Sequence, residues 1–268
     1  MNIDSLAIIG GGNMGAAFAH GLIAGGLAPS ALTIVEVDEA KRVNLGASFP
    51  GVTITEQIGA CVNAVIAVKP PAAADATASA VANGARTILS IAAGVSIATL
   101  SAAAGPGVAV VRAMPNTPAL VGKGAAGFAL GPGCGAEAER FASEVLGSVG
   151  IAVRVEESLL DAVTGLTGSG PAYLFYIAEV LIAAGVAEGL EPTTAEALVR
   201  QLFLGSGALL ATSPESPARL RENVTSPNGT TAAGLAALAA AGGDAAIHAA
   251  VRAATARSVE LGREADRR

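Results

Sequence analysis

The spacing of hydrophobic and polar positions changes part-way along the chain. From residue 6 to about 155, short apolar runs alternate with stretches of helical periodicity, as in a doubly wound, mainly parallel sheet covered by helices. The predicted strands are 6–9, 32–35, 52–54, 64–68, 87–91, 108–113, 128–130 and 151–155, with helices at 16–24 and 136–149 among them. Beyond residue 155 the predicted elements are all helices, at 158–166, 171–189, 193–212, 216–223, 230–241 and 244–265.

We therefore predict two domains, an α/β domain over residues 1–155 and an all-helical domain over residues 156–268. The helical part is unusually apolar, and residues 230–243 contain no charged side chain. Helices that are apolar on most faces are normally buried, but a domain of this size has little interior in which to bury them. A second copy of the chain would cover these faces, so we expect a homodimer through residues 156–265. A higher oligomer built of dimers stays open.

Composition narrows the classes of function. The net charge of −6 and the lack of a basic run before residue 263 argue against nucleic acid as a partner. No charge occurs between Asp4 and Glu36, but seven glycines and the lack of flanking basic residues argue against a membrane span. Cys61 and Cys134 lack metal-ligand spacing, so we expect no metal and two reduced thiols. With no signal-peptide pattern, we expect a cytoplasmic protein.

A glycine-rich segment at residues 10–15, GGGNMG, directly follows the first predicted strand and precedes a helix. This spacing allows a tight turn, a close approach of the backbone to a pyrophosphate, and close packing of the helix on the strand. Glu36 ends the next strand, 21 residues after Gly15, where an acid accepts hydrogen bonds from an adenosine ribose and repels a 2′-phosphate. A turn without function in a glycine-rich protein is the competing interpretation.

Two segments of the helical part suit a small anion. Residues 224–231, VTSPNGTT, place hydroxyls and backbone amides before an apolar helix without one charged side chain. An ordinary capped helix start accounts for the same residue types. Gly168, Ser169 and Gly170 precede Pro171 at another helix start and leave several amide donors there.

Two further strand ends carry polar groups. Lys69 follows strand 64–68, where a lysine meets a phosphate or simply leaves the core for water. In residues 112–118, RAMPNTP, two prolines stiffen a loop that holds Asn116, which either orders a nicotinamide carboxamide or belongs to a rigid connector.

These segments, at 10–15, 67–70, 112–118, 168–173 and 224–231, resemble the pyrroline-5-carboxylate reductase family in order over nearly the whole chain. The resemblance implies an N-terminal Rossmann-like domain, a C-terminal helical dimerisation domain, and reduction of 1-pyrroline-5-carboxylate to L-proline with NADPH or NADH, the last step of proline biosynthesis. With Glu36 and Asn116 added, the implied cofactor contacts are Gly10, Gly12, Asn13, Met14, Gly15, Ala67, Val68, Lys69, Pro70, Ala92, Ala93 and Gly94. The implied substrate contacts are Gly168, Ser169, Gly170, Thr225, Ser226, Gly229, Thr230 and Thr231, with the loop at 225–231 open to coming from the partner subunit.

The implied chemistry needs few special side chains. A cyclic imine is largely protonated near neutral pH, so hydride transfer depends on proximity and orientation more than on a strong acid. Ser169, Tyr176 and Thr230 are the candidate proton or hydrogen-bond donors, and the sequence does not choose among them. We predict that Thr230 contacts the substrate.

Two positions depart from the family pattern. Glu36, followed by Val37 and Asp38, replaces residues that would grip a 2′-phosphate and favours NADH, although Lys41 and Arg42 can compensate. Asn228 stands where a glycine is usual, and asparagine tolerates left-handed backbone angles better than most residues.

Two other functions compete. A β-hydroxyacid dehydrogenase shares the glycine-rich start and a helical second domain, but such enzymes use a lysine in the helical part, and no lysine occurs after Lys123. A non-catalytic dinucleotide-sensing protein would need no second anion site, which argues against that alternative.

Overall fold

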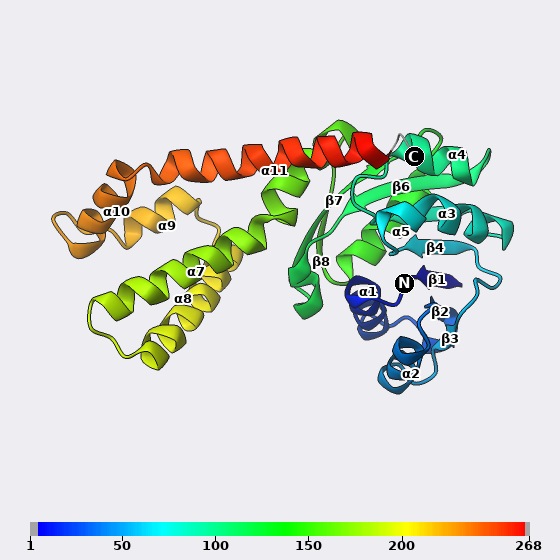
Figure 1. Cartoon of the computed structure of the whole chain (residues 1–268), viewed down its shortest axis with the longest axis horizontal. Coiled ribbons are helices and arrows are strands. Elements are labelled where there is room, and N and C mark those ends of the chain that lie inside the picture. Colours follow the sequence, from blue (N-terminus) through cyan, green and yellow to red (C-terminus); the bar gives the residue numbers. More distant parts are fainter. Residues whose placement is uncertain (1–4, 266–268) are drawn as a thin grey trace. The chain divides into compact units, whose positions relative to one another are not determined.

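The computed structural model describes residues 5–265 and separates into two compact units (Figure 1). Unit 1 contains the chain up to Ser169 together with the chain from Val251, and unit 2 contains Gly170–Ala250. The last strand ends at Arg154, whereas the division into compact units falls further along the chain.

Unit 1 is built on one eight-stranded sheet with the order β3-β2-β1-β4-β5-β6-β7-β8. Its strands are parallel except for the antiparallel pair β6–β7. The chain runs outward from β1 to β3 and then crosses back to β4, so the order reverses at β1 and β4, as in dinucleotide-binding folds. The strands are β1 Leu6–Ile9, β2 Leu32–Val35, β3 Thr53–Thr55, β4 Asn63–Ile66, β5 Thr87–Ser90, β6 Ala109–Met114, β7 Gly124–Leu130 and β8 Gly150–Arg154. The predicted doubly wound fold is confirmed.

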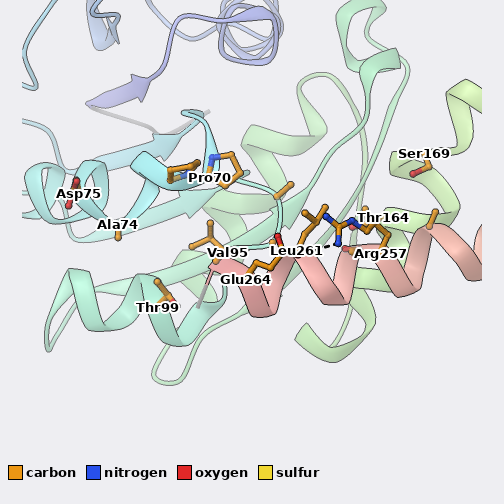
Figure 2. A pocket seen from close by; sticks show the side chains of 16 residues that line it. Pro70, Ala74, Asp75, Val95, Thr99, Thr164, Ser169, Arg257, Leu261 and Glu264 are labelled. Atoms are coloured by element: carbon orange, nitrogen blue, oxygen red, sulfur yellow. Dashed lines mark hydrogen bonds and ion pairs between the residues drawn. The ribbon is translucent and has the colours of Figure 1, made fainter. Parts of the chain in front are cut away.

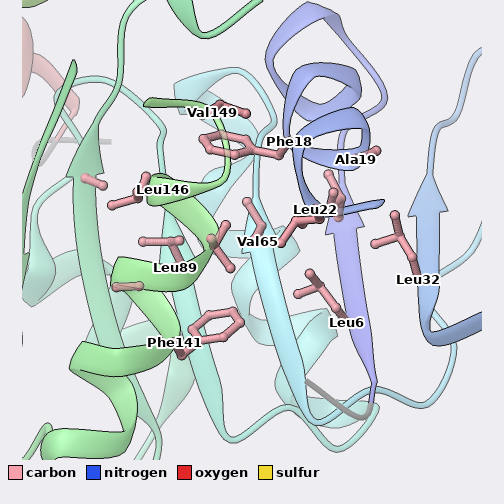
Figure 3. Close-up of a cluster of buried hydrophobic side chains, with 14 of the residues drawn as sticks. Leu6, Phe18, Ala19, Leu22, Leu32, Val65, Leu89, Phe141, Leu146 and Val149 are labelled. Carbon is pink, nitrogen blue, oxygen red and sulfur yellow. The ribbon is translucent and has the colours of Figure 1, made fainter. Parts of the chain in front are cut away.

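Both faces of the sheet are covered, which explains why β1 is apolar at every position and why its neighbours β2 and β4 are mostly apolar. In β1, Leu6 and Ile8 pack into one buried cluster, and Ala7 and Ile9 pack into the other. The first cluster includes Phe18 and other residues of α1 and α5 (Figure 3). The second includes residues of α3 and α4. These helices, with α2, are α1 Asn13–Ala24, α2 Glu39–Ser48, α3 Ala73–Ala82, α4 Ile97–Ala104 and α5 Ala136–Gly147.

The segment after the sheet is irregular where the sequence predicts one helix over 158–166. A 3-10 turn at Glu157–Leu159 leads into the short helix α6, Leu160–Val163, and then into a π-helical turn at Thr164–Gly168. Gly165 lies against Thr255 of the long helix α11, Gly243–Ala265, so closely that a Cβ would clash with the Thr255 hydroxyl. Close packing on α11 therefore accompanies the wider turn.

Unit 2 consists of α7 Gly170–Ala187, α8 Pro192–Thr212, α9 Pro217–Asn223, α10 Thr230–Ala240 and the first residues of α11. Few of its side chains are buried, and large apolar ones such as Phe175 and Leu204 are 65% and 66% exposed. Within the described residues, the helical stretch Glu157–Ala187 is long and apolar enough to cross a membrane, with 6% of its most apolar window buried. The bent pair Thr230–Ala240 and Gly243–Ala265 passes the same test of length and composition when taken together. The uncharged N-terminal stretch forms β1, α1 and β2 instead.

Candidate active site

The glycine-rich turn connects β1 to α1 at the carboxyl end of the sheet. Gly10 has a φ of +109°, and a Cβ there would lie 2.5 Å from the Ala67 carbonyl oxygen. A Cβ on Gly15 would clash with the Gly10 carbonyl. Gly12 is different, because no atom other than those of its chain neighbours lies within 4 Å of the position of its Cβ. Gly12 is also the N-cap of α1, and no side chain caps that helix, which is the arrangement expected of a helix start that binds a pyrophosphate.

Glu36 is fixed beside this turn at the end of β2. It is 9% exposed, and its Oε2 accepts a hydrogen bond of 3.1 Å from the Gly11 amide, while Oε1 accepts one of 3.0 Å from the Asp38 amide. Arg42 donates from Nη1 to the carbonyl oxygens of Glu36 and Val37, at 2.9 and 2.8 Å. The guanidinium therefore supports the backbone of this turn, and the carboxylate presents negative charge next to the predicted ribose position.

The other predicted cofactor residues lie at the carboxyl ends of the strands on one side of β1. The Ala67 amide donates to the Ile9 carbonyl at 2.8 Å, which joins the end of β4 to the end of β1. The exposed Lys69 precedes the 3-10 turn Pro70–Ala72. After β5, Gly94 takes a φ of +76° and lies against Gly262 of α11, at 3.4 Å from the position of a Cβ. The fold thus places these segments along one edge of the sheet, as the sequence predicts.

A cavity of about 670 Å³ in unit 1 brings together residues predicted for cofactor and for substrate (Figure 2). Its lining includes Pro70, Ala93, Gly94 and Ser169. Sequence reasoning missed the rest of the lining, which includes Asp75, Thr99, Thr164, Arg257, Ser258 and Leu261. The α11 residues among them were not foreseen because α11 has the mixed polar pattern of an ordinary surface helix. The one usable signal was Gly262, whose lack of a side chain permits the approach to Gly94.

A side-chain hydrogen bond joins α11 to α6 beside the cavity. Ser258 donates its hydroxyl to Asp161 at 2.6 Å. Arg257 pairs with Glu260 at 2.8 Å and with Glu264 at 3.2 Å, so its charge at the cavity rim is balanced within its own helix.

Asn116, predicted to contact the cofactor, has both polar ends of its side chain bonded to the backbone. Its Nδ2 donates to the Thr167 carbonyl at 3.0 Å, and its Oδ1 accepts from the Ala125 amide at 2.9 Å. The loop after β6 is therefore tied to the π-helical turn and to β7.

In unit 2, the loop before α10 has an unusual backbone. Asn228 has a φ of +59° and is the non-glycine residue with a left-handed backbone within the described range. The Gly229 amide donates to the Ser226 carbonyl at 3.0 Å, and Gly229 is the N-cap of α10, without any side-chain cap. The Thr225 hydroxyl donates a hydrogen bond of 2.6 Å to the Arg221 carbonyl. The hydroxyls at the start of α10 therefore do not cap the helix, which weakens the interpretation as an ordinary capped start.

The predicted substrate residues are divided between the compact units. Gly168 and Ser169 belong to unit 1, whereas Gly170 and residues 225–231 belong to unit 2. Tyr176, the third candidate donor, lies in unit 2 and is 66% exposed.

The sheet order, the glycine turn and the acid at the end of β2 define a dinucleotide-binding oxidoreductase fold joined to a helical unit. Residues 157–261 match the family described as pyrroline-5-carboxylate reductase dimerisation, and residues 5–94 match NADP oxidoreductase coenzyme F420-dependent. The pyrroline-5-carboxylate reductase of Corynebacterium melassecola is 37% identical over 97% of this chain and 100% of its own length. That of Synechocystis sp. is 40% identical, over 97% and 98%. The chain belongs to the pyrroline-5-carboxylate reductase family.

Solved structures agree with this assignment. A pyrroline-5-carboxylate reductase from Coxiella burnetii has a TM-score of 0.90 at 30% identity and covers 97% of this chain and 99% of its own. The pyrroline carboxylate reductase of Plasmodium falciparum, solved with NADP bound, has a TM-score of 0.80 at 28% identity, over 97% and 98%.

Proposed function

We propose that this chain reduces 1-pyrroline-5-carboxylate to L-proline with a reduced nicotinamide dinucleotide. The observation that carries the proposal is the cavity in which Pro70, Ala93 and Gly94 meet Ser169. The chain belongs to the reductase family, so we assign the first three residues to the cofactor and Ser169 to the substrate.

The residues at the carboxyl edge of the sheet fit the dinucleotide. The uncapped amides of α1 at Gly12 and Asn13 suit the pyrophosphate, and Ala93 and Gly94 line the cavity that would take the nicotinamide end. When bound, the reduced nicotinamide supplies the hydride for the iminium carbon of the substrate. The protein supplies position and excludes water, so no side chain has to act as a strong acid.

The substrate carboxylate needs donors rather than a full positive charge. The amides and hydroxyls of Gly168–Gly170 and Thr225–Thr231 provide such donors, and the absence of a side-chain cap on α10 leaves its first amides for an anion. Ser169 lines the cavity and Thr230 begins α10, and both remain candidate donors with Tyr176. The loop at 225–231 stays a proposed substrate contact, open to coming from the partner subunit.

The decisive assay measures oxidation of NADH or NADPH that depends on pyrroline carboxylate, with proline identified as the product. Thr230→Ala is expected to raise the substrate KM or lower turnover. A T230A enzyme with normal turnover and normal KM would remove Thr230 from the site. Absence of proline formation by the wild-type enzyme would overturn the proposal itself.

We propose further that NADH is the preferred donor. The buried Glu36 carboxylate is held by the Gly11 amide, where a 2′-phosphate would meet it, and Arg42 already donates to backbone carbonyls. Residues 36–42 are all described, and their cations are Lys41 and Arg42. Because Arg42 is bonded to the backbone of the turn, Lys41 is the cation among them that is left for a 2′-phosphate.

Glu36→Gln tests this preference, because glutamine keeps an acceptor for Gly11 and removes the charge. NADPH should then bind at least about fivefold more tightly, since two unit charges at 4 Å in water interact by about 1 kcal/mol. Glu39→Gln, in the first turn of α2, is the matched control for a general change in charge. Dissociation constants from nucleotide fluorescence, measured without substrate, give the readout. A wild-type enzyme that binds NADPH more tightly than NADH would contradict the role assigned to Glu36.

The dimerisation family that matches residues 157–261 supports a homodimer through the helical region at 156–268, and a dimer of that kind is part of the proposal. Burial raises the pKa of the Cys61 thiol, and both cysteines are free, which is compatible with the cytoplasm as the proposed location.

A further inference from the structure

Helix α7 has a proline, Pro171, as its second residue, just after the π-helical turn Thr164–Gly168. In a regular α-helix, the amide of residue 171 would donate to the carbonyl of Thr167, but Pro171 has no N–H. The carbonyl is nevertheless paired, because Asn116 Nδ2 donates to it at 3.0 Å. A side chain from the loop after β6 thus supplies this carbonyl with a donor that residue 171 cannot provide.

The segment that this hydrogen bond holds is the π-helical turn Thr164–Gly168. The Ser169 amide closes the turn by donating to the Thr164 carbonyl at 2.8 Å, and the Thr167 hydroxyl donates to Val163 at 3.0 Å. Wider turns of this kind are frequent at functional sites. Thr164, which begins the turn, and Ser169, which directly follows it, both line the cavity.

Two other contacts brace the same turn. Met114 lies against Gly168, where a Cβ would be 2.9 Å from its Cε. Gly165 packs against Thr255 of α11. Asn116 is in turn anchored by the Ala125 amide, which donates to its Oδ1 at 2.9 Å. The amide plane of Asn116 is therefore fixed from one end and available to hold Thr167 with the other.

We propose that Asn116 is a positioning residue. By supplying the hydrogen bond that Pro171 cannot make, it fixes the π-helical turn and so sets Ser169 in the cavity where substrate and nicotinamide meet. This inference rests on the proposed function, and it assigns Asn116 an action through Thr167 instead of direct contact with the cofactor.

A double-mutant cycle between Asn116 and Pro171 tests the inference, because Pro171→Ala restores the backbone N–H that can reach Thr167. In the background of the natural proline, N116A should lower kcat about tenfold, the effect of one lost hydrogen bond at a site that needs exact positioning. In the P171A background the same substitution should cost less than about twofold. Pro192→Ala, at the first turn of α8, is the matched background that restores no such bond and should leave the tenfold loss intact.

Two readouts separate this role from the alternatives. The dissociation constant for NADH, measured by fluorescence without substrate, should be unchanged by N116A, whereas loss of a direct cofactor contact would raise it. Hydrogen exchange of residues 160–173 should quicken in N116A and return toward the wild-type rate in N116A/P171A. This second readout does not depend on turnover, so it distinguishes failure of the inference from failure of the proposed reaction.

If N116A does not fold, Asn116→Asp takes its place, since it keeps the acceptor for Ala125 and loses the donor for Thr167. An equal loss of kcat in the proline and P171A backgrounds, or a weaker affinity for NADH without rescue, would overturn the inference.

Discussion

Asn228 shows how one residue can keep a loop conformation that normally belongs to glycine. Its φ of +59° is left-handed, and the Gly229 amide that follows bonds back to Ser226 at 3.0 Å. The free-energy cost of this conformation is lower for asparagine than for most residues with a Cβ, because its short polar side chain can form local hydrogen bonds. Asparagine at position 228 therefore adopts a backbone conformation that a glycine would also allow.

Substitution at this position should follow the cost of the left-handed conformation. Asn228→Gly should leave the substrate KM within about twofold, whereas Asn228→Val should cost about 1–2 kcal/mol locally and raise KM, because a β-branched residue resists positive φ. Steady-state kinetics on both variants checks this expectation. A valine variant with the wild-type KM would show that the backbone at 228 does not matter for binding.

Gly10 and Gly12 separate the structural and the functional requirement for glycine in the same turn. A Cβ on Gly10 would lie 2.5 Å from the Ala67 carbonyl oxygen, whereas one on Gly12 would meet no atom within 4 Å other than those of its chain neighbours. Gly10→Ala should therefore lower stability by several kcal/mol, through overpacking and a disfavoured φ.

Gly12→Ala should lower stability much less than Gly10→Ala, by less than about 1 kcal/mol for the change at the N-cap of α1. It should weaken NADH binding by about tenfold or more, because the methyl group takes the space into which the pyrophosphate fits. Thermal melting and nucleotide titration on both variants give the comparison, with Gly46→Ala in α2 as a control whose Cβ also meets open space. Tight NADH binding by G12A would mean that the pyrophosphate lies elsewhere.

At the scale of elements, most helices and strands could be predicted from the sequence, because the local hydrophobic pattern agrees with the packing. The central strands are apolar on both faces, so the runs at 6–9 and 32–35 were found at their observed limits. The segment at 158–166 was predicted as one helix, and its apolar spacing contains no sign of the π-helical turn. That turn depends on the close packing of Gly165 on α11 and on the bond from Asn116, both distant in sequence.

The same limit applies to the site. The glycine turn, the strand ends and Ser169 have local signatures, and the fold places them as expected. The lining from Arg257, Ser258 and Leu261 has none, since a helix that returns to the cavity from the end of the chain looks like any surface helix. The hydrogen bonding of Asn116 was likewise hidden, because its partners lie 9 and 51 residues away.

Glu157 joins three elements of unit 1. Its Oε1 accepts from the Ile97 amide at 2.7 Å, which caps the start of α4, and lies 3.1 Å from Arg112 Nη1 at β6. Glu157→Ala should lower the free energy of unfolding by about 2 kcal/mol, because it leaves a largely buried arginine and a helix amide without this partner. Glu157→Gln should cost less, since it keeps an acceptor for Ile97.

Urea unfolding followed by circular dichroism measures both changes. Glu156→Ala is the matched control, because it removes the same charge from a neighbouring side chain that is exposed. An equal loss of stability in the two alanine variants would mean that the hydrogen bonds of Glu157 contribute nothing.

At the scale of the whole molecule, unit 2 exposes an apolar surface that one chain does not cover. Phe175, Tyr176 and Leu204 are each about two-thirds exposed, and the stretch Glu157–Ala187 is apolar enough to resemble a membrane span. Apolar surface on this scale marks an interface. The match of residues 157–261 to a dimerisation family identifies a second copy of the chain as the expected cover.

Helix α7 is the part of this surface at which the dimer contact can be tested by one substitution. Phe175→Arg on α7 should shift the protein toward a monomer, because a charge placed in an apolar interface loses its hydration without gaining a partner. Val43→Arg on α2 is the control, as its side chain is 68% exposed and lies in unit 1. Sedimentation at micromolar concentration should give the dimer mass for V43R and a smaller mass for F175R. If F175R keeps the wild-type mass, the exposed face of α7 does not form the dimer contact. If the loop at 225–231 acts across the interface, F175R should also lose proline formation while it still binds NADH.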